Sequence, residues 1–321
     1  MIANISRLEG FHACRQKEHN VNTLKLIPLL EAEPLVTGWA THLGFATLLA
    51  KKDVNLALVE GEKVYRDRIA TQVLLPEEKE LFERRILFVK AAIQAYHKVL
   101  PSEGYEILMP EVTFRVAIPN SEHHCWYCHN LLTPNAPYED CPHNRVAPCW
   151  QPYYFKGRTD AVVRWDGMIW LLEHKTSSDN KGTFWDQWYL DWQCTGYLYG
   201  IWKATGIRPQ GFILNKINKP NKRQDPTQVS IQREPFLRSD EDLQRFEKEF
   251  LLRAQDYEES MRLGRIWLNP DNCVSWSRRC DFHKKCMDHQ SFDSLAYRAK
   301  PMDYVEEEYY TLLNLNKGGL K

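Results

Sequence analysis

The stretch that decides the fold is Gly157-Arg158-Thr159-Asp160-Ala161-Val162-Val163-Arg164-Trp165-Asp166-Gly167-Met168-Ile169-Trp170-Leu171-Leu172-Glu173-His174-Lys175. Runs rich in apolar and β-branched residues flank Asp166-Gly167. An Asp-Gly pair between two such runs is the strongest short-range signal for a two-residue hairpin turn. The stretch therefore predicts a β-hairpin in which Trp165 faces Met168.

The register of this hairpin follows from its turn. Counting outward sets Asp160 opposite Glu173 and Arg158 opposite Lys175. Opposed side chains have Cβ atoms roughly 4.5–5.5 Å apart, so two carboxylates destabilise each other there. Mg²⁺ neutralises such a pair, because it prefers carboxylate oxygens and keeps water in its remaining positions. With Lys175 on the same face as Glu173, one pleat along, we expect a metal site with a cation beside it.

Two interpretations of these three charged residues are open. Bound metal would generate hydroxide and stabilise charge on a phosphodiester, which predicts metal-assisted hydrolysis. The alternative is an ion-pair ladder on a half-exposed hairpin. The apolar residues Val162, Ile169 and Leu171 share their face, which favours a core-facing position where unpaired charges are costly.

An Asp followed by Glu-x-Lys on the next strand resembles the PD-(D/E)XK nucleases. The wider pattern resembles their RecB-like exonuclease branch, which includes CRISPR-associated members. Gly38-Trp39-Ala40-Thr41-His42 is similar to its Gly-x-x-x-His motif, and Gln193-Cys194-Thr195-Gly196-Tyr197 to its Gln-x-x-x-Tyr helix. The resemblance runs from about Ser6 to Cys286. It implies an α/β, restriction-endonuclease-like core with a mixed central sheet flanked by helices, after an N-terminal helical region.

The resemblance also implies roles for single residues. The ligands of Mg²⁺ or Mn²⁺ would be His42, Asp160, Glu173 and the main-chain carbonyl of His174. Lys175 would orient the attacking water or stabilise the transition state.

Gln193 and Tyr197 are four residues apart and share a helix face; by the same resemblance they would contact the DNA backbone near the metals. Glu111 is a further acidic candidate. Aromatic residues near this helix either stack on single-stranded bases or, as we expect for most, belong to the core. These are Phe184, Trp185, Trp188, Tyr189, Trp192, Tyr199 and Trp202.

The overall charge balance limits where a nucleic-acid-binding surface could lie. The 42 basic and 42 acidic residues give a formal net charge of zero, so any such surface must be local. The best candidate is the segment from Asn215 to Arg223, which is equally consistent with a solvated loop. Its four cations are Lys216, Lys219, Lys222 and Arg223. The acidic run from Asp303 to Glu308 is not expected to contact DNA.

Eight of the nine cysteines fall into two groups, and Cys194 stands apart. Cys14 joins three cysteines near the other end of the sequence, Cys273, Cys280 and Cys286. Four thiolates satisfy either Zn²⁺ or an iron–sulfur cluster. The one-plus-three distribution resembles the RecB-like cluster nucleases and implies a [4Fe–4S] clasp that joins distant parts of the chain.

The second cysteine group lies in an insertion, residues 119–150. Cys125-x2-Cys128 is the usual half of a zinc knuckle, and Cys141 with Cys149 or His143 would complete it. Unliganded cysteines are the alternative. The insertion comes just before the hairpin, which suggests a flap over the DNA path.

The remaining pattern predicts one domain over residues 1–321. Apolar periodicity predicts helices over 77–100, 185–204 and 239–263, the last starting with a Ser239-x-x-Asp242 capping box, and strands over 111–118 and 211–216. No phosphate-binding Gly-x-x-x-x-Gly-Lys-Ser/Thr loop is present, which argues against a helicase motor. No apolar run reaches 18 residues and no signal peptide is evident, so we expect a cytoplasmic protein with no membrane partner.

Together these patterns predict a metal-dependent DNA exonuclease acting preferably on single-stranded ends. The expected setting is recombination, repair, phage DNA metabolism or CRISPR spacer processing, in a bacterial, archaeal or phage-infected cell, with recombination or CRISPR adaptation proteins as possible partners. A non-catalytic DNA-binding or assembly subunit that keeps the fold is the alternative.

Overall fold

The structure is a computed structural model. It describes residues 2–29, 33–69, 76–118, 123–124, 131–132, 153–178, 182–221, 223–275, 278–288 and 296–299.

The predicted hairpin forms from β6 (Tyr153–Trp165) and β7 (Met168–Ser177). Both turn residues have positive φ, 49° at Asp166 and 74° at Gly167, as a type I′ turn requires. Trp165 faces Met168, and the ladder continues for five pairs to Ala161 and Leu172. The predicted register is thus confirmed up to the residues next to Asp160 and Glu173.

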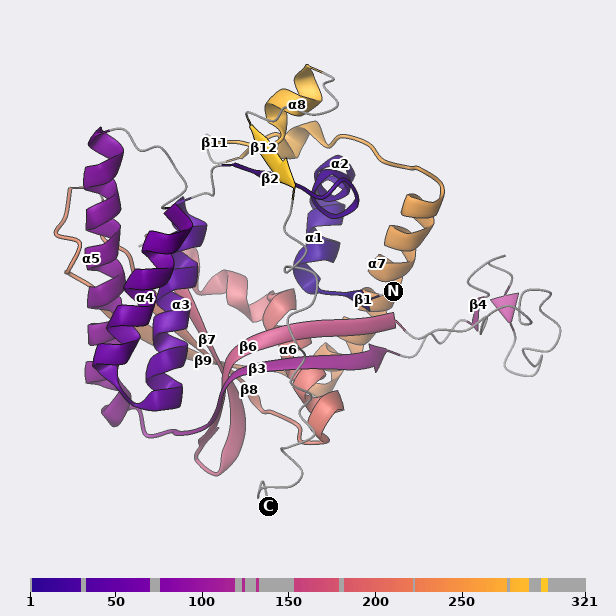
Figure 1. Cartoon of the computed structure of the whole chain (residues 1–321). Coiled ribbons are helices and arrows are strands. Elements are labelled where there is room, and N and C mark those ends of the chain that lie inside the picture. The colour runs from indigo at the N-terminus through magenta and orange to yellow at the C-terminus, as the bar shows by residue number, and fades with distance from the viewer. Residues whose placement is uncertain are drawn as a thin grey trace.

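This hairpin is the middle of a six-stranded mixed sheet (Figure 1). β3 (Glu106–Ile118) runs antiparallel along the other side of β6, β8 (Gly211–Asn218) parallel to β7, and β9 (Ser230–Leu237) antiparallel to β8. Strands 111–118 and 211–216 were expected, whereas β9 was not.

The sheet is split beside Asp160. β7 pairs with β6 only as far as Ala161, and the short strand β1 (Ile2–Ala3) pairs with β6 at Tyr154 and Phe155. The stretch of β6 between these two ladders therefore has β3 on one side and no paired strand on the other. Asp160 lies at the end of this stretch, so its side chain can reach groups that a continuous ladder would occupy.

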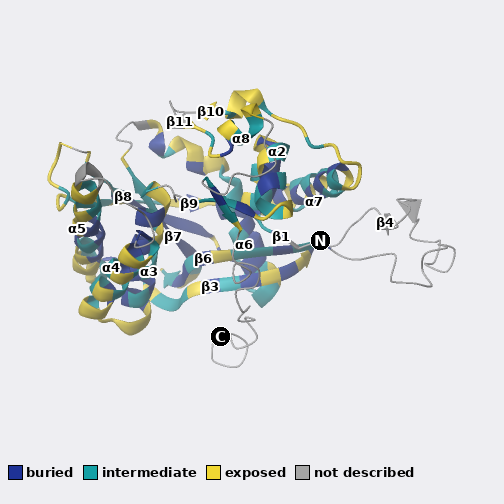
Figure 2. Ribbon diagram, turned by 45° about the horizontal axis from the view of Figure 1, so that its top comes forward, coloured by how far each residue is buried: buried dark blue, intermediate teal, exposed yellow. Residues whose placement is uncertain are grey.

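Three helices cover one face of the sheet: α3 (Glu33–Lys51), α4 (Val54–Ile69) and α5 (Pro76–Val99). α5 confirms the helix predicted over 77–100. The apolar core under these helices includes side chains from β6, β7 and β8, and Figure 2 shows it as a buried layer between helices and sheet. Gly44 is a packing glycine, because a Cβ there would overlap the side chain of Ile93 on α5.

The opposite face carries α1 (Ile5–Ala13), α6 (Trp192–Thr205) and α7 (Asp240–Arg262). The capping box of Ser239 and Asp242 is confirmed. The single helix expected over 185–204 is wrong in its start. A 3-10 turn (Asp186–Leu190) precedes α6, because Asp191 has extended backbone and caps α6 by accepting from the Cys194 amide at 2.6 Å.

A smaller layer brings distant chain segments together at one end of the sheet (Figure 1). Its main contact is the antiparallel pair of β2 (Leu26–Pro28) and β12 (Tyr297–Ala299). The other short elements are α2 (Arg15–Glu18), a π-helix (His19–Thr23), 3-10 turns (Leu100–Ser102, Gly182–Phe184, Pro270–Asn272), β4 (His123–His124), β5 (Leu131–Leu132), β10 (Val274–Ser275), β11 (Arg278–Arg279) and α8 (His283–Met287). Among the described helices, none is both long and apolar enough to cross a membrane.

Candidate active site

The predicted carboxylate pair lies where the hairpin ladder stops. Beyond the Ala161–Leu172 pair, a side chain replaces the next ladder bond: Asp160 Oδ2 accepts a hydrogen bond from the His174 main-chain amide at 2.7 Å. Glu173 is buried, with 4% of its surface exposed, and its Oε1 atom has no hydrogen-bond partner among the described residues. The structure therefore brings the buried carboxylate of Glu173 close to the partly exposed carboxylate of Asp160.

The two carboxylates have opposite electrostatic environments. Burial, together with the nearby Asp160 carboxylate, raises the pKa of Glu173 to about 8. Burial acts in the same sense on Asp160, but the His42 imidazole and the His174 amide outweigh it and hold the pKa of Asp160 well below its usual range. Asp160 is thus the permanently charged member of the pair.

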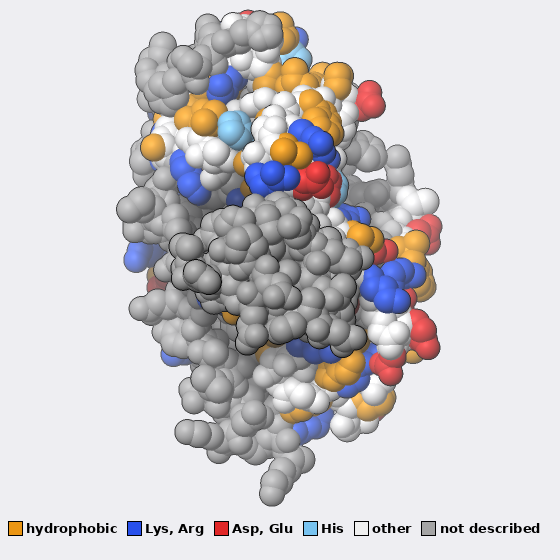
Figure 3. Space-filling view, turned by 90° about the vertical axis from the view of Figure 1, so that its right-hand side faces the viewer, with side chains coloured by type: hydrophobic (Ala, Val, Ile, Leu, Met, Phe, Trp, Pro, Cys, Tyr) orange, Lys and Arg blue, Asp and Glu red, His pale blue; other side chains and the backbone are white. Residues whose placement is uncertain are grey.

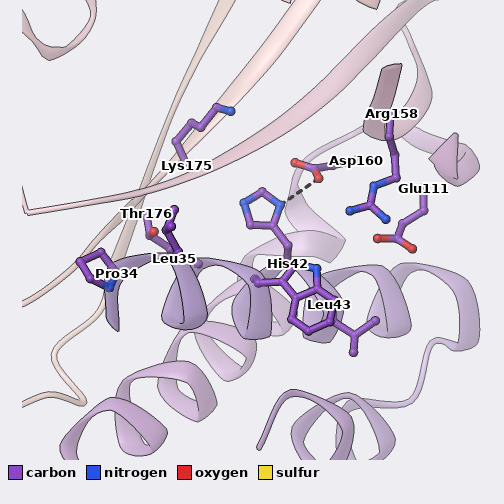
Figure 4. Close-up of a pocket in the computed structure, with 11 residues that line it drawn as sticks. Pro34, Leu35, His42, Leu43, Glu111, Arg158, Asp160, Lys175 and Thr176 are labelled. Carbon is purple, nitrogen blue, oxygen red and sulfur yellow. Dashed lines mark hydrogen bonds and ion pairs between the residues drawn. The ribbon is translucent and has the colours of Figure 1, made fainter. Parts of the chain in front are cut away.

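His42 reaches this pair from the helical side. It lies on α3, and its Nδ1 is 2.9 Å from Asp160 Oδ1, a contact seen in Figure 4. Gly38 lies one turn earlier on the same helix. The histidine of the predicted Gly-x-x-x-His motif is therefore beside the acidic pair, 118 positions away from Asp160 in the sequence.

Lys175 is joined to the predicted Gln-x-x-x-Tyr helix. Its Nζ donates to Gln193 Oε1 at 3.2 Å and lies 3.9 Å from Glu173 Oε2. Gln193 Nε2 in turn donates to the Tyr197 hydroxyl at 2.8 Å. Burial works to lower the pKa of Lys175, but the carboxylates around it, Glu173 first, outweigh burial and raise it. The lysine is therefore cationic.

A glycine lets α6 approach β6. A Cβ at Gly157 on β6 would lie 2.5 Å from the Phe114 ring and 2.9 Å from the Tyr197 ring. No side chain larger than hydrogen fits there without displacing an aromatic ring. Gly157 thus sets the distance at which Tyr197, and with it Gln193, stands from the acidic pair.

A cavity of about 420 Å³ opens on this site, within the range typical of small-ligand sites. Asp160, His42 and Lys175 contribute to its wall, and Figure 4 shows them around it. A second cavity of about 410 Å³ adjoins it along α3, and the two share Leu43 and Glu111. Asp160 is therefore accessible from outside, whereas Glu173 is buried behind it and does not line the cavity.

Glu111 has an unusual backbone at this point. Its φ is 45°, and it falls between the pairs Pro110–Ala161 and Val112–Thr159, which places it across from Asp160. A positive φ is uncommon for a residue with a side chain and often occurs at functional sites. Figure 4 shows the side chains of Glu111 and Arg158 pointing toward one another. Glu111 was the weaker acidic candidate from sequence, and it lines both cavities.

A second layer of polar residues was not anticipated. The His174 ring is buried, in contact with the Phe45 and Tyr96 rings, and Asn215 Nδ2 donates to its Nδ1 at 3.2 Å. Burial lowers the pKa of His174 to about 4, so the ring is neutral. Asn215 is held by Arg233 Nε, which donates to its Oδ1 at 2.7 Å. Only a β9 strand prediction would have placed Arg233 here.

The predicted basic segment is not an open loop of cations. Lys216 is 3% exposed, with its ammonium 4.3 Å from the centre of the Phe184 ring, and Lys219 pairs with Glu33 at 3.3 Å. Both faces of β8 are covered, since every residue from Gly211 to Ile217 is buried, and Lys216 is buried with them. Arg223 is exposed, and Lys222 lies outside the described residues. On the face seen in Figure 3, cationic, acidic and apolar side chains are interspersed.

Most of the aromatic group belongs to the core, as expected. Phe184, Trp188 and Tyr199 are buried, and Trp185, Trp192 and Trp202 are partly buried and pack against the same core, whereas Tyr189 is 57% exposed. Cys194, the cysteine outside both groups, is also buried.

The four clasp cysteines come from both ends of the described chain and gather in one region. Cys14 caps α1, and beside it Ala13 accepts hydrogen bonds from Asn269 and Asn272, at 2.9 and 2.8 Å. Burial raises the pKa of the Cys286 thiol, and Cys14, Cys280 and Cys273 are near enough to raise it further. All four are free thiols.

The proposed metal ligands that the structure describes lie in the same regions of the structure but are not arranged around a common metal position. Among the residues that the structure describes, no three His, Cys, Asp or Glu side chains are placed to hold a metal ion as they stand. The acidic site nevertheless suits a divalent cation chemically, because Glu173 Oε1 is buried without a partner beside a second carboxylate. The predicted zinc ligands lie outside the described residues: Cys125, Cys128, Cys141, Cys149 and the alternative His143.

Comparison with known proteins agrees with this geometry. Residues 3–287 match the PD-(D/E)XK nuclease superfamily. The chain belongs to that superfamily. PD-(D/E)XK nucleases generally use divalent metal ions, and a nucleic acid is the substrate that membership implies. A solved structure titled "Crystal structure of SSO0001" aligns with 68% of this chain and 73% of its own, at 16% identity and a TM-score of 0.27. No curated protein matches the chain.

Proposed function

We propose that this PD-(D/E)XK protein is a metal-dependent DNA exonuclease of the RecB-like branch that acts preferably on single-stranded ends. Its biological setting would be recombination, repair, phage DNA metabolism or CRISPR spacer processing. The observation that carries the proposal is the meeting of His42 from α3 and Gln193 from α6 at the Asp160–Lys175 site. Either motif alone would be weak support.

The site residues divide the work of hydrolysis. Asp160, Glu173, His42 and the His174 carbonyl would hold Mg²⁺ or Mn²⁺, which supplies an activated water and charge stabilisation when bound. The ammonium group of Lys175, held by Gln193, would stabilise the negative charge that develops on the phosphate. Asp160 is held in place by two contacts, to the His42 ring and to the His174 amide.

The test uses labelled oligonucleotides of about 40 nucleotides, single-stranded or duplex, each labelled at one end or the other. We expect Mg²⁺- or Mn²⁺-dependent shortening of single strands that is faster than that of duplexes, and none with chelator. A circular single strand of the same sequence separates end-dependent from internal cleavage. Binding of DNA with no cleavage under any metal would instead support the non-catalytic subunit.

The cysteine group belongs to the same proposal. Cys14, Cys273, Cys280 and Cys286 would hold a [4Fe–4S] cluster, which needs four thiolates, and structural zinc is the alternative that metal analysis decides. In support, Asn269 and Asn272 anchor to Ala13 next to Cys14. The cluster would act as a clasp, because ligands from distant parts of the chain convert binding energy into folding energy. Residues 119–150 would hold a separate zinc ion.

A further inference from the structure

One wall of the active-site cavity is apolar, and it lies on the catalytic helix itself. Leu35, Trp39 and Leu43 follow one another at intervals of four on α3 and share one helix face. All three line the cavity of about 420 Å³. Leu35 is 72% exposed and Trp39 39% exposed, so these large side chains do not belong to the core under α3.

The indole of Trp39 is held in place. The guanidinium carbon of Arg68, from the last turn of α4, lies 3.4 Å from the centre of its ring system. This cation–π contact covers one face of the indole while the ring still lines the cavity. A flat aromatic surface fixed in this way can accept another ring without first losing rotamer freedom.

The wall across the cavity is charged. Asp160, Lys175 and Arg158 line it from β6 and β7, and Figure 4 shows these side chains extending from the strands that lie opposite α3. An apolar aromatic wall facing a charged wall matches a nucleotide, which has a flat base at one end and a phosphate at the other.

The glycine of the Gly-x-x-x-His motif leaves room between these walls. A Cβ at Gly38 would meet only Thr176 Oγ1, at 3.8 Å, which is an ordinary contact. Nothing in the packing of α3 excludes a side chain there, in contrast to Gly44, where Ile93 does. Gly38 lines the cavity, so its missing side chain enlarges the space next to Trp39.

We propose that Trp39, supported by Leu35, binds the base of the nucleotide at the reacting phosphodiester by stacking. This rests on the proposed nuclease function and names what the site recognises: an unpaired base of any type. A base can enter between the walls only when it is not paired within a duplex, and stacking is tolerant of sequence because every base has a π-face. The wall would therefore be the source of a preference for single-stranded ends.

The decisive experiment pairs a protein variant with a substrate variant. Trp39→Ala should lower kcat/KM on single-stranded oligothymidylate by roughly 5- to 150-fold, the range expected for one stacked base, and Trp39→Phe should recover most of it. For the unmodified protein, kcat/KM should fall by a similar factor on an oligothymidylate that has an abasic residue at the attacked end. Substrates with the abasic residue at either end are tested. For Trp39→Ala, kcat/KM on the abasic substrate should be almost the same as on the normal one. If the loss from Trp39→Ala and the loss from the abasic residue multiply when the two are combined, the proposal is overturned.

A matched control is available on the same chain. Trp267 is 51% exposed and has the Arg15 guanidinium 3.6 Å from its ring centre, but it lines neither cavity. Trp267→Ala should leave the ratio of normal to abasic turnover unchanged. If Trp39→Ala unfolds, Leu35→Ser at a 72% exposed position provides the same comparison with a smaller expected loss.

Binding separates this proposal from the catalytic one. Anisotropy of fluorescein-labelled oligothymidylate, measured with Ca²⁺ in place of the reactive metal, should show weaker binding to Trp39→Ala than to the unmodified protein. If the unmodified protein binds but never cleaves, the nuclease proposal fails while the wall remains supported. If it cleaves and Trp39→Ala binds and cleaves equally well, the wall fails and the nuclease proposal stands.

Discussion

The ammonium group of Lys175 donates a hydrogen bond to the side-chain carbonyl of Gln193 at 3.2 Å, and this bond joins the β6–β7 hairpin to α6. The cation of the Glu-x-Lys motif is thus held by a residue of a second motif, 18 positions away. Gln193 has a second bond, to the Tyr197 hydroxyl, that fixes its orientation. The contact offers a role for the Gln-x-x-x-Tyr helix that differs from direct DNA binding.

This difference can be measured. If Gln193 holds Lys175, Gln193→Ala should lower kcat by about tenfold with little change in KM, because positioning acts on the transition state. Tyr197→Phe, which removes only the second bond, should have a smaller effect in the same direction. A rise in KM at constant kcat, together with a shallower salt dependence of binding, would instead support contact with the DNA backbone.

The acidic pair should be indispensable for hydrolysis but not for folding. Asp160→Ala, Glu173→Gln and Lys175→Ala should each reduce kcat by at least about 10³-fold, because residues that act as a unit fail together. Glu173→Gln should keep or raise the melting temperature, since it removes a buried carboxylate with an unpartnered oxygen. Steady-state cleavage and thermal melting test both statements. Near-normal cleavage by Glu173→Gln would falsify the assignment.

Two glycines of α3 should respond differently to the same change. Gly44→Val should destabilise the protein by about 1–3 kcal/mol through overpacking against Ile93. Gly38→Val should leave the unfolding free energy nearly unchanged, yet reduce kcat/KM by about tenfold by filling the cavity. Denaturant unfolding and cleavage rates provide the two readouts. Equal loss of stability in both variants would contradict the assignment of Gly38 to the cavity.

Protein prepared without oxygen should be brown, with broad absorbance near ~400 nm from thiolate-to-iron charge transfer. Cys14→Ala and Cys280→Ala should each bleach it and lower its melting temperature, because Cys14 joins the other ligands only in the folded chain. Cys194→Ala is the matched control, since that thiol is buried in α6 away from the group. A colourless protein carrying zinc on these thiols would refute the iron–sulfur proposal.

The insertion should carry its own metal. Cys125→Ser combined with Cys128→Ser should release roughly one zinc per chain while iron and colour stay, because the two ions are held by different cysteines. Elemental analysis of the paired variant and the unmodified protein gives the answer. Loss of iron from the double variant would mean that the division of the eight cysteines is wrong.

Local pattern was sufficient for the elements that carry the chemistry. The Asp166-Gly167 turn predicted the hairpin register as far as the Ala161–Leu172 pair, which places Asp160 and Glu173 near each other where the ladder stops. The structural role of Arg233 was out of reach, because β9 is an edge strand whose alternation is too weak to identify from sequence. The start of α6 was missed for a different reason: Asp191, its cap, lies inside an aromatic-rich stretch, residues 184–192, that looks like one amphipathic segment.

The burial of Lys216 and the position of Trp39 in the cavity wall could not be predicted from sequence, and the reason is the same for both. Both depend on which surface a neighbouring element covers, and that is a property of the assembled fold. Lys216 is buried because Phe184 lies over it, and Trp39 lines the cavity instead of the core because α3 turns another face to the sheet.

The split pairing of β6 affects how the protein folds while it is being synthesised. β1 at Ile2–Ala3 is paired with β6 at Tyr154 and Phe155, and Ala13 is tied to Asn269 and Asn272. During synthesis, Ile2 and Ala3 therefore wait for partners made roughly 150 residues later, and Ala13 for partners made roughly 250 residues later, at about 5–20 residues per second. Contacts of such long sequence separation form late in folding. The sheet is complete only after β9 (Ser230–Leu237) has been made, so a nascent chain would carry Asp160, Glu173 and Lys175 before the whole sheet could hold them.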